Sequence, residues 1–256
     1  MKGATERFSD RVDDYIKYRP GYPPALVGLL EERCDLAAGA RVADVGSGTG
    51  LLSKIFLEHG LEVVGVEPNE AMRRAGDRLL ARWPAFASVC GQAEATGLKQ
   101  RSVDLVVCGQ AFHWFDPAAA RREFARVLKP GGQVALIWNE RSSAATEFLV
   151  AYEQLLQTHC REYSRVNHRN VDEQVLSAFF AGADWSLEVF DNVQEFDFGG
   201  LRGRLLSSSY APNSGAASEA MLAALKEVFA AHNRDGKVRF VYQTKVYWGQ
   251  LGGGGD

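Results

Sequence analysis

Apolar residues in this chain fall into short continuous runs separated by segments with helical periodicity. Strand-like runs are predicted at 41–45, 62–67, 86–90, 103–108 and 133–138. Helices are predicted between them, at about 50–59, 69–82 and 116–128. Runs such as VVGV and VALI have no polar alternation, which is typical of strands covered on both faces. The alternation of such strands with amphipathic helices predicts parallel strands joined by right-handed crossovers, and therefore a doubly wound α/β sheet.

Further elements are predicted before and after this alternating part. In front of it, helices are predicted at 8–19 and 24–33, and the first should end at Arg19 because Pro20 disfavours helical geometry in the residue before it. Behind it, the pattern predicts helices at 144–160, 172–180 and 217–232 and extended segments at 187–198 and 238–251.

Three glycines, Gly46, Gly48 and Gly50, stand at alternate positions in DVGSGTG, directly after the first strand of the alternating part. In an open α/β sheet, ligands bind beyond the carboxyl ends of the strands, and this turn is placed there. A tight turn alone needs one glycine, and the dinucleotide fingerprint G-x-G-x-x-G needs a glycine where Leu51 stands. The spacing therefore favours a ligand against the backbone and disfavours a pyrophosphate.

The next strand ends at Glu67, twenty-one residues after Gly46. A carboxylate at a strand end can accept hydrogen bonds from both hydroxyls of a ribose. The alternative is an acid favoured by the dipole of the following helix. We favour the ribose interpretation, although it does not separate NAD from an adenosyl cofactor. The segments GQAEATGL (91–98) and CGQAFHWFD (108–116) follow the next two strands, so they lie with the glycine loop at the carboxyl ends of the strands.

Five segments in register resemble class I S-adenosylmethionine-dependent methyltransferases, in particular the small-molecule branch with a methyltransferase type 11-like domain. They are DVGSGTG, VEPNEAM, GQAEATGL, VDLVVCGQAFHWF and RVLKPGG, all within residues 8–140. The resemblance implies a Rossmann-like methyltransferase fold, with a doubly wound, mostly parallel seven-stranded sheet, N-terminal lid helices and helical insertions. It also implies the cofactor S-adenosyl-L-methionine.

In that family the glycine loop lies against the methionine part of the cofactor, and the acid after the second strand holds the ribose. The resemblance further implies that Ala93 offers backbone groups to the adenine, with Gln92 or Glu94 beside it. The segment FSDRVDDYIKYRPGYP (8–23) resembles one that closes over the cofactor, where Arg19 can pair with the cofactor's carboxylate. The cofactor-binding residues that the resemblance implies are Tyr18, Arg19, Asp44, Gly46, Ser47, Gly48, Gly50, Glu67, Pro68, Met72, Gln92, Ala93, Glu94 and Gln110.

Methyl transfer from a sulfonium is an in-line displacement, in which the protein mainly positions the reactants and excludes water. His113, in FHWF after the fourth strand, is the candidate general base because histidine titrates near neutrality. The other interpretation makes His113 part of the pocket wall, and we favour it because proximity alone can suffice. Aromatic residues that either shape an acceptor pocket or belong to the core are Trp138, Tyr152, Tyr163, Trp185 and Tyr210.

We expect one methyltransferase domain over residues 1–256, because no change in composition suggests a linker. Its expected parts are N-terminal lid helices at 1–36, a cofactor-binding core at 40–140, a helical insertion with C-terminal strands at 141–251 and a flexible tail at 252–256.

The net charge of −3 gives no basic footprint, so we expect no nucleic-acid partner. Apolar runs such as VALIW (134–138) are far too short for a membrane span, and the N-terminus has no apolar signal core. We therefore expect a cytoplasmic protein, a monomer or homodimer, with a small-molecule methyl acceptor and no metal site. Two alternatives stay open: an NAD-dependent oxidoreductase, against which Leu51 and the lack of a Tyr-x-x-x-Lys pair count, and a non-catalytic S-adenosylmethionine-binding module.

Overall fold

A computed structural model of the chain describes residues 17–160, 163, 173–208, 210–212 and 214–252. The helix predicted at 8–19 and the tail predicted at 252–256 therefore lie almost wholly outside the described residues.

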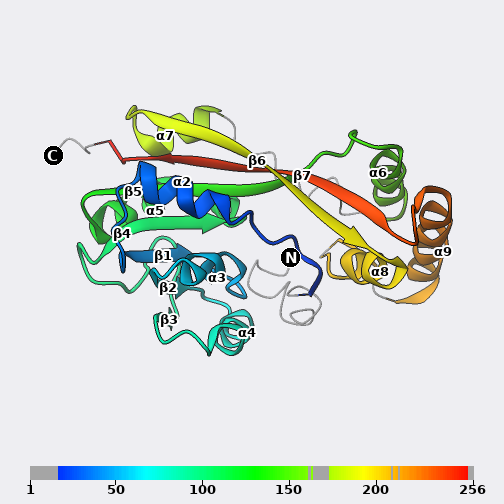
Figure 1. Ribbon diagram of the computed structural model, residues 1–256, viewed down its shortest axis with the longest axis horizontal. Coiled ribbons are helices and arrows are strands. Elements are labelled where there is room, and N and C mark those ends of the chain that lie inside the picture. The colour runs from blue at the N-terminus through cyan, green and yellow to red at the C-terminus, as the bar shows by residue number, and fades with distance from the viewer. Residues whose placement is uncertain (1–16, 161–162, 164–172, 209, 213, 253–256) are drawn as a thin grey trace.

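The core of the fold is one seven-stranded sheet with the strand order β3-β2-β1-β4-β5-β7-β6 (Figure 1). Strands β1 to β5 pair in parallel, whereas β7 runs antiparallel to both of its neighbours. The strands are β1 (Arg41–Val45), β2 (Glu62–Val66), β3 (Phe86–Val89), β4 (Val103–Gly109), β5 (Leu128–Arg141), β6 (Trp185–Phe196) and β7 (Val238–Gly249). This confirms the predicted doubly wound, mostly parallel seven-stranded sheet.

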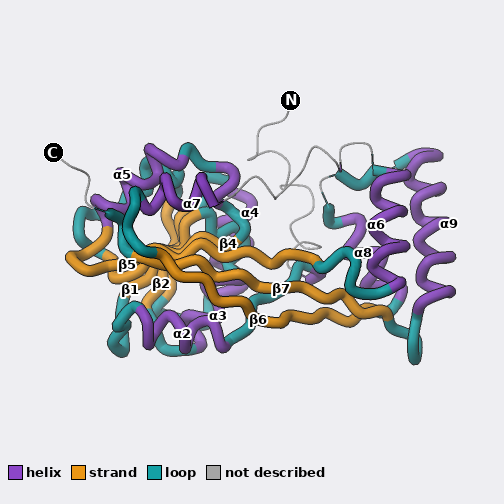
Figure 2. Tube along the Cα trace, turned by 90° about the horizontal axis from the view of Figure 1, so that it is seen from above, coloured by secondary structure: helices purple, strands orange, loops and turns teal. Residues whose placement is uncertain are grey.

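Helices cover both faces of the sheet (Figure 2). On one face α2 and α3 pack Leu30 and Phe56 against the strands, and on the other α5 and α7 pack Phe124 and Phe179. The helices are α2 (Ala25–Arg33), α3 (Leu51–Glu58), α4 (Glu70–Leu80), α5 (Pro117–Val127), α6 (Glu147–His159), α7 (Glu173–Phe180), α8 (Phe198–Leu206) and α9 (Gly215–His232), with a short 3-10 helix η3 (Phe112–Trp114). The fully buried strands explain why their sequences lack polar alternation.

A third apolar cluster lies at the far end of the long strands β6 and β7, where α6, α8 and α9 gather (Figure 1). Phe240 and Tyr242 of β7 pack there against Tyr152 of α6 and Leu201 of α8. The helical insertion is thus fastened to the same sheet as the core. Among the described residues, no helix combines the length and the apolar composition that crossing a bilayer requires.

Helix starts follow local capping chemistry. Asp116 accepts hydrogen bonds from the backbone N–H groups of Ala118 and Ala119, both at 3.0 Å, and Pro117 occupies the first helical position, as the sequence predicts. Asn69 caps α4 in the same way through the N–H of Met72, at 3.0 Å.

Two predicted elements differ from the structure. The sequence predicts a break at KPGG and a strand from 133, but β5 begins at Leu128, because the backbone from there already pairs with the start of β4. The sequence also leaves 198–206 without a helix, whereas α8 forms there, capped by Asp197, whose Oδ1 accepts from Gly200 N at 2.7 Å. Tertiary packing of Leu201 and Leu205 outweighs the poor helix propensity of FGGLRGRLL.

Candidate functional site

A cavity of about 560 Å³ opens at the carboxyl ends of β1, β4 and β5 and extends to α8 and β7. The sheet order reverses between β1 and β4, so the cavity lies at the topological switch point where ligands bind in open α/β folds. Of the predicted site residues, Arg19, Asp44, Gly46, Ser47, Gly48, Gln110 and His113 line it. The lining does not include Tyr18, Gly50, Glu67, Pro68, Met72, Gln92, Ala93 or Glu94.

The three glycines of the β1–α3 loop all have positive φ, at 73°, 54° and 80° for Gly46, Gly48 and Gly50. A Cβ at Gly46 would lie 2.5 Å from Ala111 Cβ, and one at Gly50 would lie 2.6 Å from Leu80 Cδ1. Packing within the protein thus explains two of the glycines without a ligand. Gly48 differs, because its nearest neighbour would be the flexible end of Met72, at 3.4 Å, and it lines the cavity.

Glu67 holds the glycine loop in place. Its Oε2 accepts from Gly48 N at 2.9 Å and its Oε1 from Asn69 N at 2.8 Å, so one carboxylate joins the loop to the start of α4. Burial raises the pKa of Glu67, and the two backbone hydrogen bonds oppose that rise. Because this carboxylate is buried and braces two segments, we expect it to matter for folding as well as for binding. Its contact with a ribose stays a prediction.

Asp44 places a buried acid beside the cavity. It is 1% exposed, and its Oδ2 accepts from Ser53 Oγ at 2.6 Å. Its Oδ1 has no hydrogen-bond partner among the described residues. Burial, with a smaller contribution from the charge of Glu67, raises the pKa of Asp44 to about 7, despite the opposing bonds from Ser53. A cationic group in the cavity would stabilise the ionised form.

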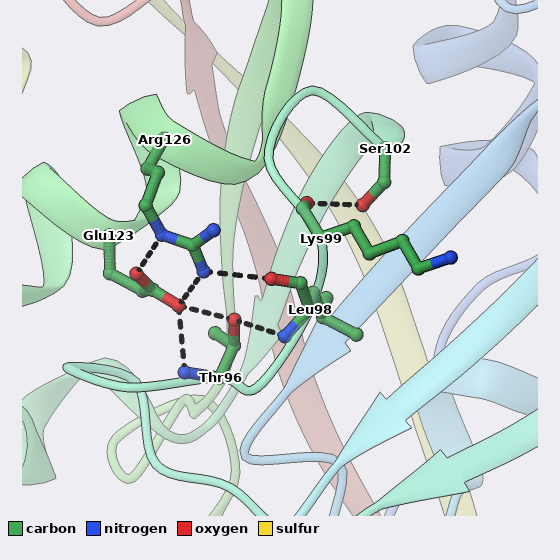
Figure 3. A network of polar contacts seen from close by, with 6 residues as sticks. All are labelled: Thr96, Leu98, Lys99, Ser102, Glu123 and Arg126. Atoms are coloured by element: carbon green, nitrogen blue, oxygen red, sulfur yellow. Dashed lines mark hydrogen bonds and ion pairs between the residues drawn. The ribbon is translucent and has the colours of Figure 1, made fainter.

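The loop after β3 carries the residues predicted to surround an adenine. Glu123 and Arg126 of α5 pin this loop (Figure 3). Glu123 Oε1 accepts from Thr96 N at 2.8 Å and from Thr96 Oγ1 at 2.5 Å, while Arg126 Nη2 donates to Leu98 O at 2.9 Å. The loop is therefore fixed in place. The roles of Gln92, Ala93 and Glu94 toward an adenine stay predictions, and Glu94 Oε1 accepts from Asp116 N at 2.8 Å.

The start of the described chain is fastened to α8 and β6. The ring of Tyr18 packs directly on Gly203, which leaves no room for a side chain there, and lies edge-on to Phe196. Arg19 lines the cavity, and its Nη2 donates to Ser207 O at 3.3 Å. Tyr18 is thus a packing residue in this structure, while the contact of Arg19 with a cofactor carboxylate stays a prediction. The lid itself falls mainly on residues outside the described part.

His113 lies in η3 at the rim of the cavity, with its ring 4.8 Å from that of Trp114 between centroids. Gln110 begins this segment with a φ of 56°, and its Nε2 donates to Asn139 O at 3.0 Å. This bond joins the ends of the neighbouring strands β4 and β5.

The wall opposite the glycine loop is polar, and sequence reasoning missed most of it. Arg141 at the end of β5 pairs with Glu153 of α6, and its Nη2 donates to Tyr163 Oη at 2.8 Å. Arg204 of α8 and Tyr242 of β7 complete this wall. Trp138, Tyr163 and Tyr210 line the cavity as one interpretation expects, whereas Tyr152 and Trp185 do not. Over the described ranges, no group of three or more His, Cys, Asp and Glu side chains is placed to hold a metal ion.

Comparison with known proteins shows the family. The sequence model of the family described as a methyltransferase domain matches residues 43–136. An uncharacterised methyltransferase of Mycobacterium tuberculosis (strain ATCC 25618 / H37Rv) is 44% identical over 134 residues, which are 52% of this chain and 52% of that protein. The chain thus matches about half the length of such curated relatives. The ubiquinone biosynthesis O-methyltransferase of Pseudomonas aeruginosa (strain LESB58) is 33% identical over 162 residues, 61% of this chain and 68% of that one.

Two solved structures share the fold. A candidate type II methyltransferase from Anaeromyxobacter dehalogenans matches with a TM-score of 0.66 and 22% identity, over 91% of this chain and 98% of that one. A SAM-dependent methyltransferase from Geobacter sulfurreducens, in complex with S-adenosyl-L-homocysteine, matches with a TM-score of 0.54 and 17% identity, over 98% of this chain and 100% of that one. Since a relative 33% identical is matched over 68% of its length, and the sheet, switch point and glycine loop agree, this chain belongs to the class I S-adenosylmethionine-dependent methyltransferase family.

Proposed function

We propose that this chain binds S-adenosyl-L-methionine at the glycine end of the cavity and transfers its methyl group to a small-molecule acceptor at the other end. The observation that carries the proposal is Asp44, a buried carboxylate at the cavity whose Oδ1 lacks a protein partner. A buried acceptor without a partner is costly, and a cationic ligand would satisfy it. The amino group and the sulfonium of this cofactor are both cationic.

The residues present fit the cofactor. Gly48 leaves the loop open toward the cavity, and Thr49 Oγ1 there has no hydrogen-bond partner among the described residues. Arg19 lies on the same cavity and suits a carboxylate. When bound, the cofactor supplies a methyl group already activated on a sulfonium.

The chain's own contribution is to position the acceptor for an in-line displacement and to exclude water. Trp114 and Trp138 wall the cavity with apolar surface, which removes water from the acceptor. The bond from Gln110 Nε2 to Asn139 O holds together the ends of the neighbouring strands β4 and β5, which both line the cavity. An acceptor atom that is already anionic requires no general base.

Thermal unfolding with ligands tests the proposed binding. We expect S-adenosylhomocysteine at about 100 times its Kd to stabilise the chain by about 2.7 kcal/mol. That corresponds to a rise in Tm of roughly 5–10 °C for a domain of this size. NAD at the same concentration should leave Tm unchanged, because the loop lacks the third glycine of the pyrophosphate fingerprint. A shift with NAD and none with S-adenosylhomocysteine would overturn the proposal.

His113→Gln tests the role of the histidine, using the acceptor found by screening small acids, phenols and amines for methyl transfer. We expect KM to rise while kcat falls less than about tenfold, because His113 packs against Trp114 as part of the wall. A general base would instead cost about a hundredfold or more in kcat, with KM little changed. Phe115→Leu, in the same segment, is the control for a packing effect. Absence of transfer to every acceptor in the screen would favour a non-catalytic binding module.

A further inference from the structure

Arg204 brings a buried positive charge to the end of the cavity remote from the glycine loop. It lies on α8, is 6% exposed and lines the cavity. Its Nη1 donates to Ser208 Oγ at 3.3 Å, and its Nε has no hydrogen-bond partner among the described residues. Hydroxyls of Tyr210 and Tyr242 lie close enough to affect its ionisation.

No carboxylate of the described chain neutralises this charge. Of the other charged side chains that line the cavity, Arg141 pairs with Glu153, Glu140 pairs with Lys245 at 2.7 Å between Oε2 and Nζ, and Arg19 donates to the backbone carbonyl of Ser207. Within the described ranges, no ion pair includes Arg204. Burial lowers the pKa of Arg204, but the surrounding tyrosine hydroxyls raise it by more, so the guanidinium stays charged.

A buried charge without a counter-ion costs several kcal/mol of stability. Such a charge is retained at a cavity when a ligand supplies the opposite charge. The cavity is thus polarised, with a surplus carboxylate, Asp44, at the glycine end and a surplus guanidinium, Arg204, at the other. The first suits a cationic cofactor, and the second suits an anion.

We propose that Arg204 binds the carboxylate of the methyl acceptor, so that the acceptor is a small carboxylic acid. This rests on the proposed function, since it places the acceptor opposite the cofactor. A guanidinium matches the planar geometry of a carboxylate through two parallel hydrogen bonds. Tyr210 brings a hydroxyl to the same cavity, whereas the hydroxyl of Tyr242 already donates to Gln194 Oε1, at 3.2 Å. The volume of about 560 Å³ must hold part of the cofactor as well, which restricts the acceptor to a small molecule.

Binding of small anions to the wild type and to two variants tests the proposal. The probes are acetate, succinate, benzoate and citrate, with inorganic phosphate as a separate arm, all against chloride at equal ionic strength and with saturating S-adenosylhomocysteine. The variant is Arg204→Met, which keeps the length of the side chain and removes the charge. The matched control is Arg202→Met, an exposed arginine on the same helix.

We expect at least one carboxylate to raise Tm of the wild type and of Arg202→Met. In Arg204→Met its affinity should fall by about thirtyfold or more, the scale for losing one partner of a buried charge pair. Without anion, Arg204→Met should be as stable as the wild type or more stable, because an uncompensated buried charge is removed. Its affinity for S-adenosylhomocysteine should stay within about threefold, since Asp44 and the glycine loop are untouched. If Arg204→Met does not fold, Arg204→Lys replaces it, with an expected loss of about tenfold.

Four outcomes would overturn the proposal. They are no shift with any of the carboxylates, an equal shift in Arg204→Met, a shift with phosphate alone, and a parallel loss of S-adenosylhomocysteine affinity in Arg204→Met. The last would assign Arg204 to the cofactor. Failure of the proposed function would give a different result. S-adenosylhomocysteine would not raise Tm of the wild type, while carboxylates tested without it would still raise Tm of the wild type but not of Arg204→Met.

Discussion

Lowering the pH from 8 to 5 is expected to weaken binding of S-adenosylhomocysteine by about a hundredfold. Asp44 must be ionised to satisfy the ligand's ammonium group, and burial raises its pKa to about 7 in the free protein. At pH 5, two units lower, only about one molecule in a hundred carries the ionised carboxylate. Binding therefore releases a proton below pH 7, and affinity rises with pH until Asp44 is ionised. Titration calorimetry between pH 5 and 8 measures how the affinity for S-adenosylhomocysteine changes with pH.

Asp44→Asn should remove this dependence. The amide oxygen can still accept the hydrogen bond from Ser53, but the charge is lost, so affinity at pH 8 should fall by about ten- to a hundredfold. The control is Asp104→Asn, an acid at the amino end of β4 whose side chain pairs with Lys129 away from the cavity. It should leave both the affinity and its slope unchanged. An unaltered pH dependence in Asp44→Asn would contradict the assigned role.

The same acid makes the free protein less stable as pH rises. Its folded pKa of about 7 lies above the unfolded value near 3.8, so the folded state binds the extra proton between these limits. The contribution of Asp44 is therefore fully present below about pH 4 and is lost as pH rises to 7. Between pH 4 and pH 7, the contribution of Asp44 to the free energy of unfolding falls by about 4 kcal/mol at most. Comparing Asp44→Asn with the wild type by urea unfolding at pH 4.5 and 7.5 isolates it from the other carboxyl groups.

The sequence predicts the cofactor half of the molecule well because that half depends on local rules. Strands buried on both faces appear as unbroken apolar runs, and Asp116 with Pro117 marks a helix start. The packing that requires glycine at positions 46 and 50 was harder to predict. Contacts of Gly46 with Ala111 and of Gly50 with Leu80 join residues far apart in the chain, and no local pattern reveals them.

The C-terminal part depends more on long-range packing: the sequence predicts α6, α7, β6, α9 and β7 close to their observed bounds but misses α8. Helix α8 was missed because its glycines disfavour a helix in isolation, although Asp197 is a usable N-cap signal. Arg204 stands at helical spacing between Leu201 and Leu205 on the buried face. An arginine within an apolar helical face is the one local sign of its position, and it becomes visible only once the helix is assigned.

Replacing Glu67 should damage the fold and the cofactor site together. In Glu67→Ala, the N–H groups of Gly48 and Asn69 both lose a buried charged acceptor, at about 1.5–3 kcal/mol for each bond. We therefore expect the free energy of unfolding to fall by about 3–6 kcal/mol, and Tm by roughly 6–24 °C. Glu67→Gln keeps one carbonyl acceptor and should lose about half as much. The loop that Glu67 braces carries Gly48, so we expect the Kd for S-adenosylhomocysteine to rise at least tenfold in both variants.

Glu62→Ala separates this effect from a general loss of charge, because Glu62 is an exposed acid at the start of the same strand. It should change Tm by less than about 2 °C. Comparing the loss of affinity for S-adenosylhomocysteine with the loss of unfolding free energy distinguishes the roles of Glu67. If Glu67 only braces the loop, Glu67→Gln should lose affinity in proportion to its loss of stability, since both follow from the same displaced backbone. If it also holds the ribose, as the family resemblance implies, affinity should fall further than stability does. A Glu67→Ala variant as stable as the wild type would contradict the bracing role, because two buried N–H groups cannot lose their acceptor without cost.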